Sequence, residues 1–273
     1  MSLVRSARRP AGSRARSDLL LAVDAGNSNV VVGVFDGLRL VAHHRLSSLT
    51  HRTEDELLLL LADLLGRTGL PAAGGRMVLC SVVPDLTAHL VRAGQRLFRR
   101  PALVVTHELR LGLRYKVLDP STLGADRITN MVAAHEIYGG PAIVVDLGTA
   151  TTFDVVTARG VVLGGVIAPG VQSSAEELFR RASRLARVEL RRPPRAIGRN
   201  TEENIQAGVV FGAVGQVDGI VGRLRREMGG RPRVIATGGL AELVARDSRT
   251  IQVVDPHLTL KGLKLIDAGL RRR

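Results

Sequence analysis

Two copies of one short pattern carry the residues of this chain that are best suited to bind phosphate. Each copy, at 19–29 and at 142–152, is an apolar run that ends in an aspartate and continues into a glycine turn rich in hydroxyl or amide side chains. Asp24 ends the first run and Asp146 the second. A strand that delivers a carboxylate to its end, followed by a tight turn of small polar groups, can hold a metal-bound phosphate through N–H and hydroxyl donors. The repetition predicts a duplicated fold whose halves face each other across a nucleotide cleft.

A carboxylate and a guanidinium stand together shortly before the second copy. Residues 124–127 read Gly-Ala-Asp-Arg and open an expected helix over 128–138. Asp126 could accept a proton from a substrate hydroxyl, and Arg127 could hold a substrate oxyanion. An aspartate in the first turn could equally do no more than complement the helix dipole.

The common nucleotide-binding motifs are missing from the sequence. It contains no Gly-x-Gly and no Gly-Lys pair, so both the dinucleotide fingerprint and the Walker loop are excluded. Phosphate binding must therefore depend on the two aspartate turns. A third piece, 234–241, reads as a strand, the glycine pair Gly238 and Gly239, and a helix. These glycines would let the backbone approach a planar ring or a ribose, although an ordinary strand-to-helix turn has the same pattern.

Composition favours a compact protein in a reducing compartment. The chain has 273 residues, 45% of them hydrophobic, and can bury a substantial core. Its longest wholly apolar stretch, 57–62, is far shorter than the roughly 20 residues of a membrane span, so we expect no membrane partner. The one cysteine, Cys80, excludes an internal disulfide and favours the cytoplasm; within an apolar strand it is expected to be inert.

The net charge of +14 does not by itself indicate a nucleic-acid-binding protein. Aromatic residues make up only 3% of the chain, there is no tryptophan, and no recognition motif accompanies the arginines. We therefore expect a solvated basic surface and no specific nucleic acid. Residues 1–17 are basic and lack an acidic residue. We interpret them as a disordered extension, or as the result of a start codon assigned too early, rather than as a targeting segment.

Alternating strands and helices predict an α/β protein. Each half reads as a strand meander followed by alternating helices and strands, which suits a ribonuclease H-like domain. We predict one domain over 18–123 and a second over 124–273, with the active-site cleft between them as in actin-like ATPases. Strands are expected at 19–24, 30–35, 39–46, 77–83, 102–106, 142–146, 152–157, 161–167 and 233–237, and helices at 53–65, 86–98, 128–138, 173–186, 201–227, 239–246 and from 259.

Six ordered motifs resemble type III pantothenate kinases over about residues 19–267. They are Asp24 to Ser28, Gly124 to Arg127, Asp146 to Thr152, Gly164 to Gly170, Gly198 to Thr201 and Thr237 to Gly239. The resemblance implies ATP-dependent phosphorylation of the pantothenate hydroxyl, the first step of coenzyme A synthesis. It also implies a homodimer, Mg²⁺ and a monovalent cation, K⁺ or NH₄⁺.

The same resemblance implies roles for individual residues. Asp126 would be the proton acceptor, Asp24 would lie near Mg²⁺, and Asp146 would bind the monovalent cation. For the ionised form of Asp126 we expect an ordinary pKa of about 3.9. The residues expected to bind ATP are Asp24, Ala25, Gly26, Asn27, Ser28, Asn29, Thr149, Gly238 and Gly239. Those expected to bind pantothenate are Tyr115, Gly124, Ala125, Asp126, Arg127 and Thr201.

Two other functions remain open at this point. A kinase for another small hydroxylated acid would share the aspartate turns, and a substrate panel would separate it from a pantothenate kinase. A non-enzymatic regulator could use the same fold as a nucleotide-dependent binding module, and it would bind nucleotide without turning it over.

Overall fold

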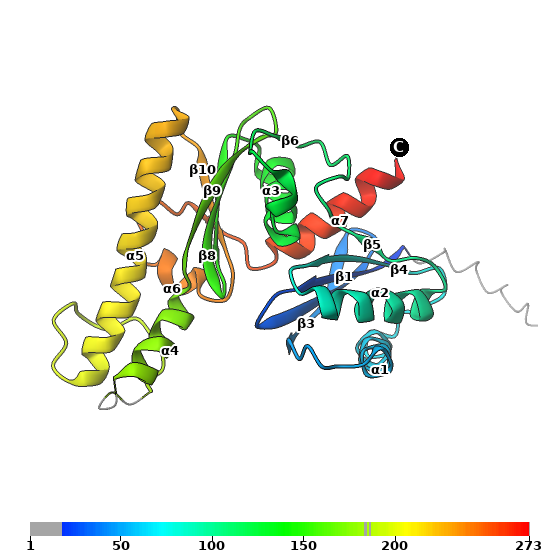
Figure 1. Cartoon of the computed structure of the whole chain (residues 1–273), viewed down its shortest axis with the longest axis horizontal. Coiled ribbons are helices and arrows are strands. Elements are labelled where there is room, and N and C mark those ends of the chain that lie inside the picture. The colour runs from blue at the N-terminus through cyan, green and yellow to red at the C-terminus, as the bar shows by residue number, and fades with distance from the viewer. Residues whose placement is uncertain (1–17, 183–184, 186, 273) are drawn as a thin grey trace, which may run out of the picture.

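The computed structural model describes residues 18–182, 185 and 187–272, so the extension predicted for 1–17 lies outside the described residues. Two β-sheets form the framework (Figure 1). The first has the strand order β3-β2-β1-β4-β5, in which β1 to β3 form an antiparallel meander and β4 and β5 run parallel to β1. Its strands are β1 (Leu19–Ala25), β2 (Asn29–Asp36), β3 (Arg39–Ser47), β4 (Arg76–Ser81) and β5 (Leu103–Val104).

The second sheet repeats this plan. Its order is β11-β10-β7-β8-β9-β6, with an antiparallel meander of β7 to β9 and with β10 and β11 parallel to β7. The strands are β7 (Ala142–Leu147), β8 (Ala150–Val156), β9 (Val161–Pro169), β10 (Arg233–Thr237), β11 (Val253–Val254) and the added edge strand β6 (Arg114–Tyr115). The predicted duplication and the α/β class are confirmed, because β7 occupies the position in its sheet that β1 occupies in the first.

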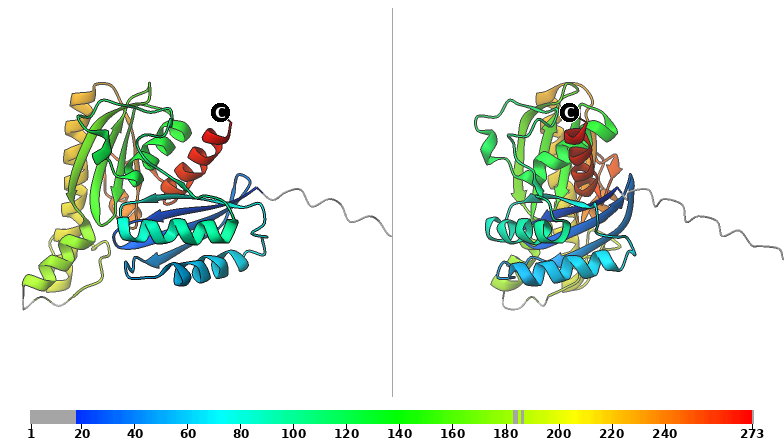
Figure 2. Two further views of the ribbon diagram at one scale, coloured as in Figure 1. Left: turned by 45° about the vertical axis from the view of Figure 1, so that its right-hand side comes forward. Right: turned by 90° about the vertical axis from the view of Figure 1, so that its right-hand side faces the viewer.

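Two helices cover the outer face of the first sheet: α1 (Glu54–Gly66) and α2 (Pro84–Phe98), which Figure 2 shows on one side of it. Thr53 and Glu56 form a capping box that starts α1. Leucines of both helices pack on the alternate apolar residues of β1 that face them. Successive side chains of β1 point to opposite faces of the sheet. The residues between these therefore belong to a separate core on the other face.

The outer face of the second sheet is covered by α4 (Val171–Arg181), α5 (Thr201–Met228) and α6 (Ala241–Ala245). Helix α5 is long and apolar enough to cross a membrane by length and composition alone. However, Val210, Val214, Val217 and Val221 are buried in one face of this helix, and most of them pack into the core of the second sheet. We therefore interpret α5 as a core helix of a folded domain.

Two further helices lie between the sheets: α3 (Ala125–Tyr138) and α7 (Leu258–Arg271) (Figure 1). A short 3₁₀ helix, η1 (Pro120–Thr122), precedes α3. Helix α7 comes last among the described elements, yet it packs through Leu260, Leu263 and Ile266 against β1 and β4 of the first sheet. Conversely, β6 falls within the predicted first domain but belongs to the second sheet. Two elements therefore cross the domain boundary that the sequence predicted at residue 124.

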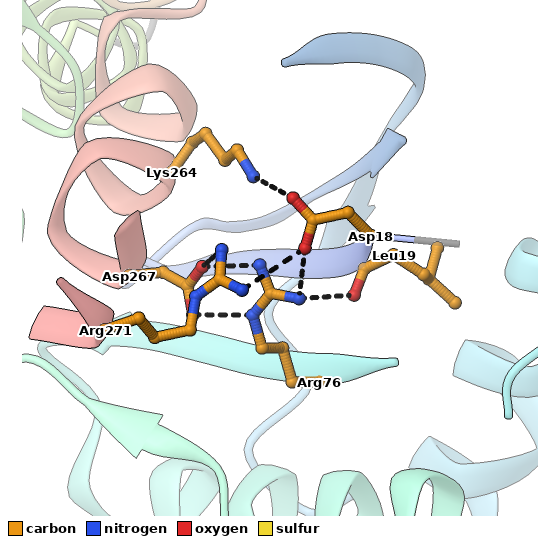
Figure 3. A network of polar contacts seen from close by, with 6 residues as sticks. All are labelled: Asp18, Leu19, Arg76, Lys264, Asp267 and Arg271. Carbon is orange, nitrogen blue, oxygen red and sulfur yellow. Dashed lines mark hydrogen bonds and ion pairs between the residues drawn. The ribbon is translucent and has the colours of Figure 1, made fainter. Parts of the chain in front are cut away.

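Close packing and ion pairs hold α7 in this place. Gly262 lies against α3 so closely that a Cβ there would be 2.4 Å from the carbonyl oxygen of Thr129. Nearer the end of α7, Asp267 pairs with Arg76 of β4 at 2.7 Å, and both side chains are largely buried. Asp18, Lys264 and Arg271 complete this network (Figure 3). The helix is thus attached to α3 at one point and to the first sheet at another.

We expect Gly262→Ala to lower the free energy of unfolding by about 1–3 kcal/mol, because an atom forced against backbone overfills the core. The matched control is Gly269→Ala on the same helix, where the new Cβ meets nothing within 4 Å beyond the nearby backbone of the helix itself. Better helix propensity should make that variant more stable, by up to about 1 kcal/mol. Denaturant unfolding of both variants measures the difference. Equal effects of the two substitutions would contradict the close crossing of α3 and α7.

Candidate active site

The two aspartate turns have similar local geometry. Strand β1 brings Asp24 near its end, and the N–H of Gly26 then donates to the carbonyl of Asn29 at 2.9 Å. Strand β7 does the same for Asp146, and the N–H of Gly148 donates to the carbonyl of Ala150 at 3.1 Å. Each turn therefore closes on the first residue of the following strand and leaves its carboxylate at the end of a buried strand.

The two turns meet. The side-chain oxygens of Ser28 and Thr149 are 2.8 Å apart, within hydrogen-bond distance, although one comes from each half of the chain. Both lie in a single cleft, and every residue predicted to bind ATP lines it except Ala25. The side chain of Ala25 is buried in the core beneath α1 and α2 instead. The duplicated pattern therefore does bring its halves face to face.

Three carboxylates, those of Asp24, Asp126 and Asp146, line the same cleft. Burial raises the pKa of Asp24 to about 7, and the charges of Asp126 and Asp146 act in the same direction. Burial and the charge of Asp126 also raise the pKa of Asp146 to about 7. Because like charges in a desolvated site oppose each other's ionisation, this group is stabilised in its charged form by cations.

Asp126 occupies the first turn of α3. Its Oδ1 accepts a hydrogen bond from the N–H of Arg127 at 2.8 Å, and a Cβ at Gly124 would be 2.4 Å from that oxygen. A side chain at position 124 would therefore force the carboxylate to move from this place. Burial raises the pKa of Asp126 despite its neighbour's N–H and positive charge. The ordinary pKa expected from the sequence is wrong, because the sequence does not show this desolvation.

Two neutral side chains support Asp146. The Nδ2 of Asn130 donates to its Oδ2 at 3.0 Å, and the Oγ1 of Thr259 donates to the Oδ1 of Asn130 at 2.8 Å. Gly238 has a φ of +93°, and a Cβ there would be 2.6 Å from the Oδ1 of Asp146. Helices α3 and α7 and the turn after β10 thus converge on one carboxylate without placing a positive charge against it.

Cys80 supports Asp24. Its fully buried thiol donates to the Oδ1 of Asp24 at 3.3 Å across the β1–β4 pair. Burial and the nearby carboxylates raise the pKa of this thiol well above its ordinary value. It therefore stays protonated, as an inert thiol would, and acts as a hydrogen-bond donor beside the cleft.

Arg127 is held by an acid that the sequence analysis missed. Its Nη2 lies 2.6 Å from the Oδ1 of Asp154 in β8, and the Asp154 side chain is only 1% exposed. A Cβ at Gly165 of the adjoining strand would be 2.8 Å from that same Nη2. The glycine makes room for the pair, and the pair fixes the guanidinium beside Asp126.

Of the six residues predicted to bind pantothenate, Asp126 lines the cleft and the other five do not. Tyr115 lies on β6, and its buried hydroxyl has no hydrogen-bond partner among the described residues. Thr201 is the exposed first residue of α5, at the end of that helix remote from α3 (Figure 1). Gly124, Ala125 and Arg127 stay next to Asp126 at the start of α3.

The sequence carried signals for two of the supporting residues. Asn130 follows Asp126 by four positions on a helix, a spacing that places both on one face. Asp154 is an acid inside a buried strand, an arrangement that requires a partner. Thr259 carried no such signal, because its contact exists only through the crossing of α7 and α3.

Comparisons with known proteins agree with this geometry. The family model for type III pantothenate kinase matches residues 20–223. A type III pantothenate kinase of Moorella thermoacetica is 47% identical over 249 residues, which cover 91% of this chain and 98% of that protein.

Solved structures of actin-like ATPases share the fold. MreB 5 of Spiroplasma citri, solved with AMPPNP, gives a TM-score of 0.58 at 10% identity over 93% of this chain and 97% of that one. The ROK hexokinase of Thermus thermophilus gives 0.53 at 15% identity, over 93% and 100%. The sequence relationship over most of the chain, on a fold with both aspartate turns in one cleft, shows that this chain belongs to the type III pantothenate kinase family.

Proposed function

We propose that the chain transfers the terminal phosphoryl group of ATP to the hydroxyl of pantothenate, forming 4'-phosphopantothenate in the first step of coenzyme A synthesis. The observation that carries this proposal is the meeting of the two aspartate turns at Ser28 and Thr149, with Asp126 in the same cleft. Phosphoryl transfer depends on positioning and charge neutralisation more than on covalent chemistry. The turns supply donors for phosphate oxygens, and Asp126 supplies a base of raised pKa for the hydroxyl proton.

The carboxylates of the cleft fit two cations. We propose that Asp24 faces Mg²⁺ and that Asp146 faces K⁺ or NH₄⁺. Among the described residues no three His, Cys, Asp or Glu side chains converge as a complete metal site. This suits Mg²⁺, which typically takes one or two carboxylates and completes its shell with phosphates and water. When bound, the cations would neutralise phosphate charge, while Asp24 and Asp146 would orient them.

We propose that the active unit is a cytoplasmic homodimer in which Thr201 serves the partner's pantothenate site. Its distance from the cleft of its own chain supports this arrangement. An open strip on the exposed face of α5 is also formed by Gly208, Gly212 and Gly215, where a Cβ would meet nothing within 4 Å beyond the nearby backbone of the helix itself. Each glycine costs a helix about 1 kcal/mol relative to alanine, and such a strip permits close packing of a second helix. The unpartnered hydroxyl of Tyr115 supports a polar substrate near β6.

The purified protein should release ADP from Mg²⁺-ATP with pantothenate as the only acceptor. Asp126→Asn should lower kcat by roughly 10²–10⁴, because it removes the base but keeps its size. Wild-type kcat should fall as the pH drops through the raised pKa of Asp126. This fall should occur at a higher pH than the value near 4 at which an ordinary aspartate titrates. A coupled ADP assay across pH measures both effects.

The control for that assay is Asp85→Asn, which changes an exposed aspartate in the first turn of α2 and should leave turnover unchanged. Near-normal turnover by Asp126→Asn would remove Asp126 from the role of base. Nucleotide binding without turnover of pantothenate would favour a regulator, and turnover with a different hydroxylated acid would favour another kinase.

The two cation sites should respond separately to substitution. Asp24→Asn should raise the Mg²⁺ concentration needed for half-maximal rate several-fold, because a ligand charge beside a hard cation is lost. Asp146→Asn should abolish the several-fold rate increase expected when K⁺ or NH₄⁺ replaces Na⁺ at constant ionic strength. Each variant is the control for the other in the same kinetic titrations. Equal wild-type rates in Na⁺ and K⁺, or identical responses of the two variants, would contradict this division.

A mixing experiment tests the shared site. Thr201→Glu should block pantothenate binding by repelling its carboxylate, while an acid in the first turn of α5 should not weaken the helix. Chains carrying Thr201→Glu and chains carrying Asp126→Asn should each be nearly inactive as homodimers. Subunit exchange between them should restore activity, because each mixed dimer contains one intact site. Full activity of Thr201→Glu alone, or no recovery after verified exchange, would show that Thr201 does not serve a partner's site.

A further inference from the structure

Arg45 lies in register with one of the cleft carboxylates. In the first sheet Asp24 of β1 is directly opposite Val31 of β2, and Val31 is directly opposite Arg45 of β3. Side chains at paired positions of neighbouring strands share one face of a sheet. The three residues therefore form a row across the sheet, and this row places Arg45 on the side of Asp24.

The guanidinium of Arg45 reaches the opposite half of the molecule. A Cβ at Gly239, in the turn after β10, would be 3.1 Å from its Nη1, so the group lies over the backbone of that glycine. Arg45, Asp24 and Gly239 all line the cleft that contains the two turns. One side chain from the edge strand of the first sheet thus spans the mouth of the cleft to the glycine pair of the second half.

Arg45 forms no direct ion pair with an acidic side chain in the described part of the chain. Arg45 is the one positively charged side chain among the described residues that line the cleft, facing Asp24, Asp126 and Asp146. The exposed side chain has no hydrogen-bond or ion-pair partner among the described residues. Its positive charge opposes the rise in pKa of both Asp24 and Asp146. Its guanidinium donors are therefore free for a ligand that enters the cleft.

We propose that Arg45 binds the terminal phosphates of the nucleotide, an inference that rests on the proposed use of ATP. A triphosphate entering a cleft with three carboxylates needs positive charge near its phosphates. A planar guanidinium can donate two parallel hydrogen bonds to phosphate oxygens, which an ammonium group cannot do. The aspartate turns then contact the phosphates from within the cleft, and Arg45 contacts them from its rim.

The test compares the binding of Mg²⁺-ATP and of adenosine by calorimetry. Arg45→Ala should weaken ATP binding roughly 10- to 100-fold, as expected for loss of hydrogen bonds to a charged group. Its adenosine affinity should stay within about twofold of the wild type, since adenosine has no phosphate. Arg45→Lys should fall between the two, because it keeps the charge and loses the paired geometry. The control is Arg39→Ala on the same strand, which lies outside the cleft lining and should bind both ligands normally.

Three results would overturn the inference: unchanged ATP affinity in Arg45→Ala, equal losses for ATP and adenosine, or the same loss in Arg39→Ala. Melting temperatures of the ligand-free variants show whether folding is intact, and Arg45→Lys supplies the answer if the alanine variant is unstable. Failure of the wild type to bind ATP would overturn the proposed function and this inference together. Binding of ATP without phosphorylation of pantothenate would overturn the proposed function alone, and the phosphate contact would still be decided by the Arg45 variants.

Discussion

The structure around the cleft is organised by like charges removed from water. Asp24, Asp126 and Asp146 lie in one cleft, and burial raises the pKa of each. The neutral donors beside these carboxylates reduce the repulsion between their charges without removing it. Cys80 and Asn130 each donate a neutral hydrogen bond to one carboxylate. The protein therefore keeps a strongly negative centre that is complementary to cations carried in with phosphate, while its two halves supply phosphate donors around it.

The local pattern of the sequence was enough to predict most of the framework. The apolar runs ending at Asp24 and Asp146 predicted β1 and β7 to within one residue, since a buried strand beside a glycine turn leaves little freedom. The acid-led start of α1 was predicted within one residue because Thr53 and Glu56 satisfy the first backbone donors locally. The repeated strand–turn pattern also predicted that Ser28 and Thr149 belong to turns that face each other.

The parts that were missed depend on contacts between distant segments. Strands β6 and β11 are only two residues long, too short for an alternating pattern to identify them. The placement of α7 against the first sheet follows from Arg76, which pairs with Asp267 across 191 positions. The raised pKa of Asp126 and the reach of Arg45 are likewise properties of the assembled cleft. The local sequence cannot show which side chains are removed from water on folding. It also cannot show that a long side chain of one half of the molecule reaches the other half.

The path of α7 has a consequence for the order in which the molecule can form during synthesis. The face of the first sheet that carries Leu20, Ala22 and Val78 is covered by α3 and α7. Until residues 258–271 leave the ribosome, that apolar face lacks one of its two covering helices. This face of the first sheet is therefore completed only when the last helix of the second half is available. A chain interrupted after β11 would expose part of this apolar face, a surface prone to association with other unfinished chains.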